Sequence, residues 1–378
     1  MIASKGFSKV SASLLILLFA AGLMVGGLVS FYINYEQVNS LNSQVANLQS
    51  QVSDLKGFQN ATYQTINILQ NGTSLAALYQ SVRDSIVLIQ GDTSSGTVQG
   101  SGFVYTFSGR TVVLTNYHVV EGTTGLSVTF SDGNGYSATV LGTDPYSDLA
   151  VLSVNALSSE FKPVNIVSSS TLGVGESVIA IGNPYGLVGS LTTGVVSALG
   201  RTITEDTAGG FAIANIIQTS TPINPGNSGG PLLNAAGNVV GITTAIVSDS
   251  QGLGFAIPSN TILREISSLI TNGYYTGHAY LGVTGEDMDY SLAQQYGASV
   301  TYGWRIATVV GGGPSDGKLN VGDIVIALNN QTIRNNDDLA TYLEEHTLPG
   351  DSLVITVVRG NSQLDVTVVL AARPPPKT

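Results

Sequence analysis

Cysteine is absent from this chain of 378 residues. Disulfides, thiolate nucleophiles and cysteine-ligated zinc or iron–sulfur centres are therefore excluded. The histidines number only three, His118, His278 and His346, and they are too scattered for a metal site of the H-E-x-x-H type. We therefore expect neither a metal nor an organic cofactor.

Charge is also scarce, since Asp, Glu, Lys and Arg make up 10% of the chain, against a typical share of about 25%. Acids exceed bases by 25 to 14, the net charge is -11, and Lys and Arg form no cluster that could neutralise a run of phosphates. Nucleic acid is therefore not an expected partner. The hydrophobic share of 43% excludes a disordered acidic chain, and the length allows roughly two or three domains.

No residue between Lys9 and Glu36 is charged, and the stretch is rich in Leu, Val, Ala and Ile. As a helix, residues 10–33 would span about 36 Å, more than the hydrocarbon core of roughly 30 Å. A cleaved signal peptide is the alternative, but its apolar core is shorter and no small-residue cleavage site is evident here. We therefore predict a transmembrane anchor in the lipid bilayer over residues 10–33. Lys5 and Lys9 precede it, which places the N-terminus in the cytoplasm and the rest of the chain outside.

A predicted helical stalk follows at residues 36–77. Apolar residues recur there at alternating spacings of three and four, which is a heptad seam that favours self-association. A short helix lying on the membrane or on the next domain is the alternative. The seam consists of Val38, Leu41, Val45, Leu48, Val52 and Leu55.

Short β-branched runs separated by Gly, Asn, Asp and Ser fill the chain from about residue 81 to residue 258. About a dozen such runs predict an all-β sandwich or a pair of barrels. The period then changes to that of a helix, which Ser259 could cap and Asn272-Gly273 could end. Its predicted apolar face consists of Ile262, Leu263, Ile266, Leu269 and Ile270. We predict one folded unit over residues 78–271, which includes this helix.

The last unit, residues 279–372, mixes strands with two helical stretches, near Tyr290–Tyr296 and Asp337–Glu345. This pattern predicts a separate α+β module.

Two unrelated patterns overlap in the sequence GNSGG at Gly226–Gly230. As G-x-S-x-G it would be the nucleophile elbow of an α/β-hydrolase, but the helix which that turn requires is missing after Ser228. As G-x-S-G-G-P within a β-barrel, the turn would direct the amides of Gly226 and Ser228 at one point and form an oxyanion hole. The second interpretation fits the surrounding strands.

A serine nucleophile needs a base, and the base needs an orienting group. His118 lies at the end of a β-branched strand, and Asp148 comes 30 residues later, before another strand. With Ser228, the chain order is His, Asp, Ser, as in chymotrypsin-like double barrels. Each residue alone has a structural explanation, as a turn residue, a strand-entry cap and an ordinary serine.

The segments TNYHVVEG, DPYSDLAVL, GESVIAIGNPYGL, TTGVVSALGR, QTSTPINPGNSGGPL and GLGFAIPSN resemble, in order, the HtrA/Deg family of trypsin-like serine proteases. The resemblance implies a mainly β chymotrypsin-like fold of two perpendicular six-stranded barrels, with His118, Asp148 and Ser228 as the triad. It implies an oxyanion hole at Gly226, Asn227 and Ser228. Digestive relatives carry Asp at the place of Asn227, so activation by cleavage is not expected.

The resemblance also implies regulatory and substrate-binding positions. Arg201 begins a stretch, up to residue 213, that resembles the sensor loop. The strand at residues 241–246, with Ile242 and Thr243, should pair with an extended substrate. Ile223 lies beside the predicted pocket, where we expect small or medium aliphatic residues before the cut. Ser220 departs from the Asp of many relatives.

The C-terminal unit resembles a PDZ domain, with Tyr280, Leu281, Gly282 and Val283 as the carboxylate-binding loop for C-terminal peptides. His278 and His346 are expected to be structural or solvent-exposed. Together these features indicate a membrane-anchored endopeptidase for unfolded or damaged proteins, assembled as a homo-oligomer. The resemblance implies a trimer, whereas the Val/Leu seam by itself favours a dimer. The alternative is a noncatalytic PDZ scaffold or a chaperone-like holdase.

Overall fold

The computed structural model divides the chain into two compact units, residues 1–68 and 69–378. It describes residues 74–94, 96–183, 189–204, 212–224, 226–244 and 253–375, together with isolated positions between 17 and 45. Most of the predicted anchor and most of the predicted stalk lie outside the described residues. Among the described residues, no helix has both the length and the apolarity to cross a membrane. Of the predicted seam, Val38, Leu41 and Val45 are described, and all three are exposed.

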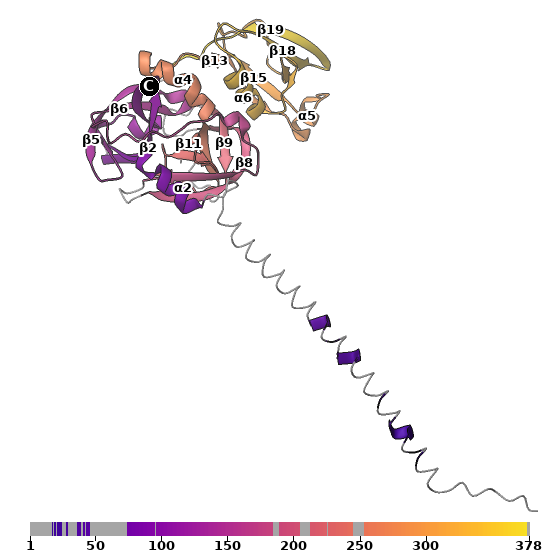
Figure 1. Cartoon of the computed structure of the whole chain (residues 1–378). Coiled ribbons are helices and arrows are strands. Elements are labelled where there is room, and N and C mark those ends of the chain that lie inside the picture. Colours follow the sequence, from indigo (N-terminus) through magenta and orange to yellow (C-terminus); the bar gives the residue numbers. More distant parts are fainter. Residues whose placement is uncertain are drawn as a thin grey trace, which may run out of the picture. The chain divides into compact units, whose positions relative to one another are not determined.

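The first globular element is a closed barrel in the strand order β1-β2-β3-β6-β5-β4 (Figure 1). Each strand pairs antiparallel with its neighbours, and alternate side chains fill the interior. The helix α2 (Leu75–Val82) and the 3-10 turn η1 (Arg83–Ser85) precede the barrel. Its strands are β1 (Ile86–Thr93), β2 (Gly96–Phe107), β3 (Arg110–Thr115), β4 (Thr124–Thr129), β5 (Gly135–Asp144) and β6 (Leu149–Val154).

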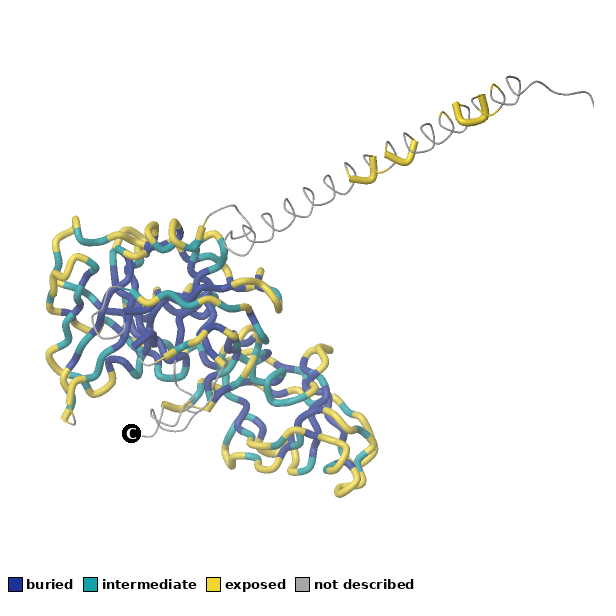
Figure 2. Tube along the Cα trace, turned by 90° about the horizontal axis from the view of Figure 1, so that it is seen from below, coloured by how far each residue is buried: buried dark blue, intermediate teal, exposed yellow. Residues whose placement is uncertain are grey.

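The second element is another closed barrel, in the order β10-β11-β12-β9-β8-β7. The predicted mainly β trypsin-like pair of six-stranded barrels is therefore confirmed. Buried residues line the interiors, whereas exposed residues concentrate on the outside (Figure 2). The strands are β7 (Ser177–Gly182), β8 (Ser190–Thr204), β9 (Ala212–Thr219), β10 (Pro231–Asn234), β11 (Val239–Thr244) and β12 (Gly254–Pro258). Three one-turn helices connect strands, namely α3 (Tyr117–Val120), η2 (Pro145–Ser147) and η3 (Ser169–Thr171).

The predicted helix after the second barrel is α4 (Ser259–Asn272), and it ends at Gly273 with a left-handed φ of 86°. Two details of the prediction were wrong. Ser259 is not the cap, because Pro258 takes that position and the Ser259 hydroxyl instead donates to the carbonyl of Val167. Leu263 is not on the buried face, since its side chain is 39% exposed.

The C-terminal module has a two-stranded and a six-stranded sheet. Its own core surrounds Trp304, the single tryptophan of the chain. Both predicted helices are present, as α5 (Tyr290–Tyr296) and α6 (Asn336–His346), each capped by an Asp or Asn side chain. The strands are β13 (Ala279–Tyr280), β14 (Val283–Asp287), β15 (Trp304–Val309), β16 (Ile324–Leu328), β17 (Gln331–Thr332), β18 (Ser352–Arg359), β19 (Ser362–Val369) and β20 (Ala371–Ala372).

Candidate active site

The paired strands β3 and β6 bring two of the predicted catalytic residues together. His118 lies on α3, directly after β3, and Asp148 directly precedes β6. The Nδ1 atom of His118 is 3.0 Å from Oδ1 and 2.9 Å from Oδ2 of Asp148. The backbone amide of His118 also donates to Oδ1, at 2.9 Å. The imidazole is therefore oriented by a carboxylate, as a general base requires.

Asp148 adopts a left-handed conformation, with φ 49° and ψ 43°, which is uncommon for a residue with a side chain. Neighbours hold it there: the backbone amide of Tyr117 and the side-chain amide of Asn116 both donate to its carbonyl. The hydroxyl of Thr244, in β11 of the second barrel, donates to Oδ2 at 3.2 Å. The carboxylate is fully buried, so these contacts fix it from both barrels.

Ser228 lies in a buried turn that hydrogen bonds to the first barrel. The amide of Ser101 in β2 donates to the carbonyl of Ser228 at 2.8 Å, and the Ser101 hydroxyl donates to the carbonyl of Gly226 at 2.6 Å. At Gly229, with φ 84°, an added Cβ would lie 2.1 Å from the Ser101 carbonyl and 2.2 Å from the Thr115 hydroxyl. Only glycine fits there.

The helix that carries His118 and the turn that carries Ser228 pack on the same glycine. A Cβ added at Gly100 would lie 2.7 Å from Val119, the neighbour of His118, and 3.1 Å from the Ser228 carbonyl. The close approach of β2 to both segments thus depends on the missing side chain. The candidate site therefore lies between the two barrels, where these two segments approach β2.

The predicted oxyanion hole is only partly consistent with the turn. The amide of Asn227 donates to the carbonyl of Asn224 at 2.9 Å, so it belongs to the turn and not to an anion site. The side-chain Oδ1 of Asn227 is buried without a hydrogen-bond partner among the described residues. Gly226 has a left-handed φ of 96°. The backbone amides of Gly226 and Ser228 remain the predicted hydrogen-bond donors of the oxyanion hole.

Two predicted substrate contacts need correction, because Ile242 and Thr243 are fully buried. Both edges of β11 are already paired, with β10 and β12. The hydroxyl of Thr243 instead donates to the carbonyl of Asn227 at 2.7 Å and so supports the turn that carries Ser228. The rest of the predicted pairing segment, residues 245–246, lies outside the described residues. Ile223 packs partly buried against the core of the second barrel.

Arg201 contacts the PDZ module. Its Nη1 is 3.0 Å from Oδ2 of Asp337 in α6, and the neighbouring amide of Thr202 donates to the other oxygen at 2.8 Å. Thr341 of the same helix donates to the carbonyl of Gly200. Most of the predicted sensor loop, residues 205–211, lies outside the described residues. The described beginning of that stretch thus contacts helix α6 of the C-terminal module.

A groove of 210 Å³ lies between the predicted carboxylate-binding loop and α6. Tyr280, Leu281, Gly282 and Val283 line one side, and apolar residues of α6 line the other. Gly282 has a φ of 75°, and its carbonyl accepts from the amide of Val310. The groove has the extended strand and helix walls that β-strand addition of a peptide requires.

The other two histidines differ from each other. His346 is half exposed, as expected. His278 is buried, with Nε2 2.6 Å from Oδ2 of Asp144 and Nδ1 3.1 Å from Oε2 of Glu344. Burial alone would lower the pKa of His278, but the hydrogen bonds to these two carboxylates outweigh it and raise the pKa to about 10.

Sequence reasoning missed Ser101 as well as the bond from the Ser147 hydroxyl to Glu265, at 2.9 Å. Ser147 immediately precedes Asp148, so this bond helps to fix the turn that presents the carboxylate. No local signal could have revealed either contact. The partners are 125 and 118 residues apart in the chain.

Comparison with known proteins agrees with this geometry. Residues 100–242 match the trypsin-like peptidase domain family, and residues 279–370 match the PDZ domain family. A probable periplasmic serine endoprotease, DegP-like, of Chlamydia pneumoniae is 40% identical over 74% of this chain and 56% of its own length. The chloroplastic protease Do-like 1 of Arabidopsis thaliana is 35% identical over 85% of this chain and 75% of its own length.

The chain spans about half the length of the bacterial DegP-like relatives. Among solved structures, that of the HtrA-type protease AlgW with a tripeptide is similar, with a TM-score of 0.65 and 32% identity. The match covers 80% of this chain and 99% of that one. With both domains and both barrels matched, the chain belongs to the HtrA family of trypsin-like serine proteases that carry a PDZ domain.

Proposed function

We propose that this protein is a serine endopeptidase in which His118 is the general base, Asp148 orients it and Ser228 is the nucleophile. The observation that carries the proposal is the pair of contacts from both oxygens of the buried Asp148 to Nδ1 of His118. This arrangement leaves the opposite edge of the imidazole as the edge that exchanges protons with a serine hydroxyl. The buried glycine turn around Ser228 supplies the predicted oxyanion donors at Gly226 and Ser228.

The direct test is labelling with diisopropyl fluorophosphate, which phosphorylates an activated serine. We expect one label for each purified chain, located by mass spectrometry on Ser228 and lost in Ser228→Ala. Ser220→Ala is the matched control, because Ser220 is an exposed serine of the same segment and its loss should leave labelling unchanged. A protein that resists labelling but still prevents aggregation of unfolded proteins would instead be the noncatalytic scaffold or holdase.

The substrate class that we propose is unfolded or damaged protein. Extended chains can enter a seam between two barrels, whereas folded domains cannot present the backbone that the site must reach. Cleavage of casein, but not of a stable folded protein of equal size, is the expected result. Equal cleavage of both would contradict a role in protein quality control.

We also propose that the PDZ groove binds peptides through their C-terminal carboxylate, and that this binding influences the protease. Support comes from the loop at Gly282 and from the ion pair between Arg201 and Asp337 in α6, a helix that also lines the groove. A fluorescent peptide with a free, apolar C-terminus should bind, and the same peptide with an amidated end should not. If both bind equally, the groove does not recognise the carboxylate.

Finally, we propose that residues 10–33 anchor the protein, with the protease and PDZ domains outside the cytoplasm, as a homo-oligomer. The uncharged stretch and the preceding lysines support this topology. The full chain should stay with membranes after extraction at alkaline pH, whereas a chain without residues 2–33 should be released. Light scattering of the detergent-purified chain tests whether the oligomer is the trimer that the family resemblance implies.

A further inference from the structure

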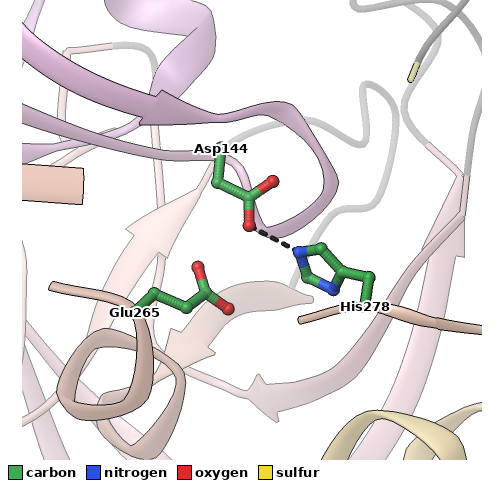
Figure 3. A group of neighbouring side chains, drawn as sticks. All are labelled: Asp144, Glu265 and His278. Carbon is green, nitrogen blue, oxygen red and sulfur yellow. Dashed lines mark hydrogen bonds and ion pairs between the residues drawn. The ribbon is translucent and has the colours of Figure 1, made fainter. Parts of the chain in front are cut away.

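Three buried side chains from distant parts of the sequence meet outside the active site: Asp144, Glu265 and His278 (Figure 3). They come from the end of β5, from α4 and from the segment before β13. One potential ligand atom of each residue lies within 4.8 Å of the other two. At this separation, one bound cation could draw all three ligand atoms into its coordination shell.

Each of the three side chains has one polar atom already held by a neighbour outside the group. Of the remaining atoms, Asp144 Oδ2 and His278 Nε2 face each other, and a carboxylate oxygen of Glu265 lies within 4.8 Å of a ligand atom of each. The outer contacts run from the Tyr146 amide to Asp144 Oδ1 at 2.9 Å, from His278 Nδ1 to Glu344 Oε2 at 3.1 Å, and from the Ser147 hydroxyl and Arg264 Nη2 to Glu265 Oε1 at 2.9 and 2.7 Å.

The inner atoms are not all satisfied. Oδ2 of Asp144 and Nε2 of His278 lie 2.6 Å apart. Oε2 of Glu265, on a side chain with no exposed surface, has no hydrogen-bond partner among the described residues. A buried carboxylate oxygen without a partner is costly, and a bound cation would remove that cost.

We propose that Asp144, Glu265 and His278 form a binding site for a divalent transition-metal ion of the Zn²⁺ type. One imidazole with two carboxylates is a donor set that Zn²⁺ accepts, with bonds of about 2.0–2.2 Å. The outer contacts match those of known metal sites. There, a ligating histidine donates a hydrogen bond from its other ring N–H to a carboxylate, and ligating carboxylates also accept hydrogen bonds. Glu344 plays that outer role toward His278.

The geometry needs little adjustment. Two ligand atoms of a tetrahedral zinc ion lie about 3.3 Å apart, given those bond lengths. Asp144 Oδ2 and His278 Nε2 therefore separate slightly from their present 2.6 Å. Binding displaces the proton that the two atoms share, as metal binding to a protonated histidine requires.

Charge favours a cation at this place. The carboxylates of Asp144, Glu265 and Glu344 outnumber the guanidiniums of Arg264 and Arg373, both of which lie near the cluster. Arg264 contacts the outer oxygen of Glu265, so it does not occupy the inner position. Once the ion displaces the proton of His278 and Glu265 is ionised, three carboxylates face two guanidiniums, and this excess of negative charge favours a bound cation.

A cavity of 270 Å³ adjoins two of the three proposed ligands. Asp144 and His278 line it together with Tyr146, Tyr274 and Tyr275. An ion in this cavity would contact these two ligands first. Because the ligands come from β5, α4 and the segment leading into the PDZ module, bound metal cross-links the first barrel to that segment.

The test uses the full chain with Ser228→Ala, purified in detergent and stripped with a chelator, so that its outcome does not depend on proteolysis. Co²⁺ is titrated as a spectroscopic substitute, and Zn²⁺ is then added as competitor. We expect a saturable visible absorption band of Co²⁺ with one ion for each chain, abolished by Zn²⁺.

Variants locate the ion. Glu265→Gln keeps the size and the outer hydrogen bond but weakens ligation, and His278→Gln removes the imidazole, so both should abolish the band. Glu344→Gln changes the outer contact to His278 and the ion pair with Arg264 but none of the three ligands, and it should weaken binding by about 10- to 100-fold. His346→Gln, a change at an exposed histidine, should have no effect. Circular dichroism identifies any variant that fails to fold.

Absence of saturable binding to the folded parent chain overturns the proposal, and so does binding that survives Glu265→Gln in a folded protein. Loss of binding in His118→Ala but not in Glu265→Gln assigns the ion to the catalytic histidine and equally overturns the proposed site.

Discussion

Two aspartates four residues apart, Asp144 and Asp148, each hold a histidine from another segment of the chain, with opposite consequences. Asp148 contacts only the Nδ1 edge of His118, whose side chain is 21% exposed at the seam between the barrels. Asp144 contacts Nε2 of His278, while Glu344 contacts the other nitrogen, and that side chain is 5% exposed. The same combination of residue types, Asp and His, thus forms a candidate proton-transfer site in one place and a buried cluster in the other.

The difference lies in the number of carboxylates and in burial. One carboxylate orients an imidazole and stabilises its charged form only when a proton arrives. Two carboxylates around a buried ring keep it charged, so its proton is not available for catalysis in the neutral pH range. A histidine beside an aspartate is therefore not by itself a catalytic pair.

The largest expected effect concerns the first pair. Ser228→Ala or His118→Ala alone should lower kcat by on the order of a million-fold, because triad members act as a unit. The fold should persist, since neither change removes a core side chain. Casein hydrolysis by the purified variants, with circular dichroism for folding, measures both expectations. Cleavage by pure Ser228→Ala protein at nearly the parental rate would exclude Ser228 as the nucleophile.

A smaller effect is expected from the second pair, and on stability. His278→Leu leaves Asp144 buried without its cationic partner, which should lower the free energy of unfolding by about 3–5 kcal/mol. Urea denaturation in the presence of chelator, followed by circular dichroism and by the fluorescence of Trp304, measures the loss. The matched change His346→Leu, at an exposed histidine, should stay within about 0.5 kcal/mol of the parent. Equal stability of the two variants would mean that the buried cluster contributes nothing net.

The comparison also shows what the sequence could predict. Local patterns were sufficient for the strands, for α5 and for α6, because alternation, helical period and capping residues act over short distances. They left a sandwich and a pair of barrels open, and the family resemblance favoured the barrels. The pairing of His118 with Asp148 was predictable from chain order and family resemblance.

The second pair was not predictable. His278 has no motif, and its partners lie 134 and 66 residues away, so only the packing of α4 and α6 creates the cluster. Burial of Ile242 and Thr243 was missed for a similar reason. The sequence identifies β11 as a strand, but only the closed barrel shows that both of its edges are paired.

The smallest expected effect is a change in the pH midpoint of kcat/KM between variants of the buried histidine His278 and the exposed histidine His346. It nevertheless distinguishes His118 from His278 most directly. His118 must be neutral to accept the proton of Ser228, so activity should fall roughly tenfold for each pH unit below the pKa of His118. His278 should not contribute to this limb, because its two carboxylates raise its pKa to about 10. The midpoint of the rising limb should therefore be the same in the parent, in His346→Ala and in His278→Ala, even where the last variant is less stable. The assays are run at a temperature where all three proteins are folded, so that loss of folded protein does not alter the measured kcat/KM. A midpoint that moves in His278→Ala would show that the buried cluster reaches the catalytic base electrostatically, and activity that peaks in acid would remove His118 from its role as general base.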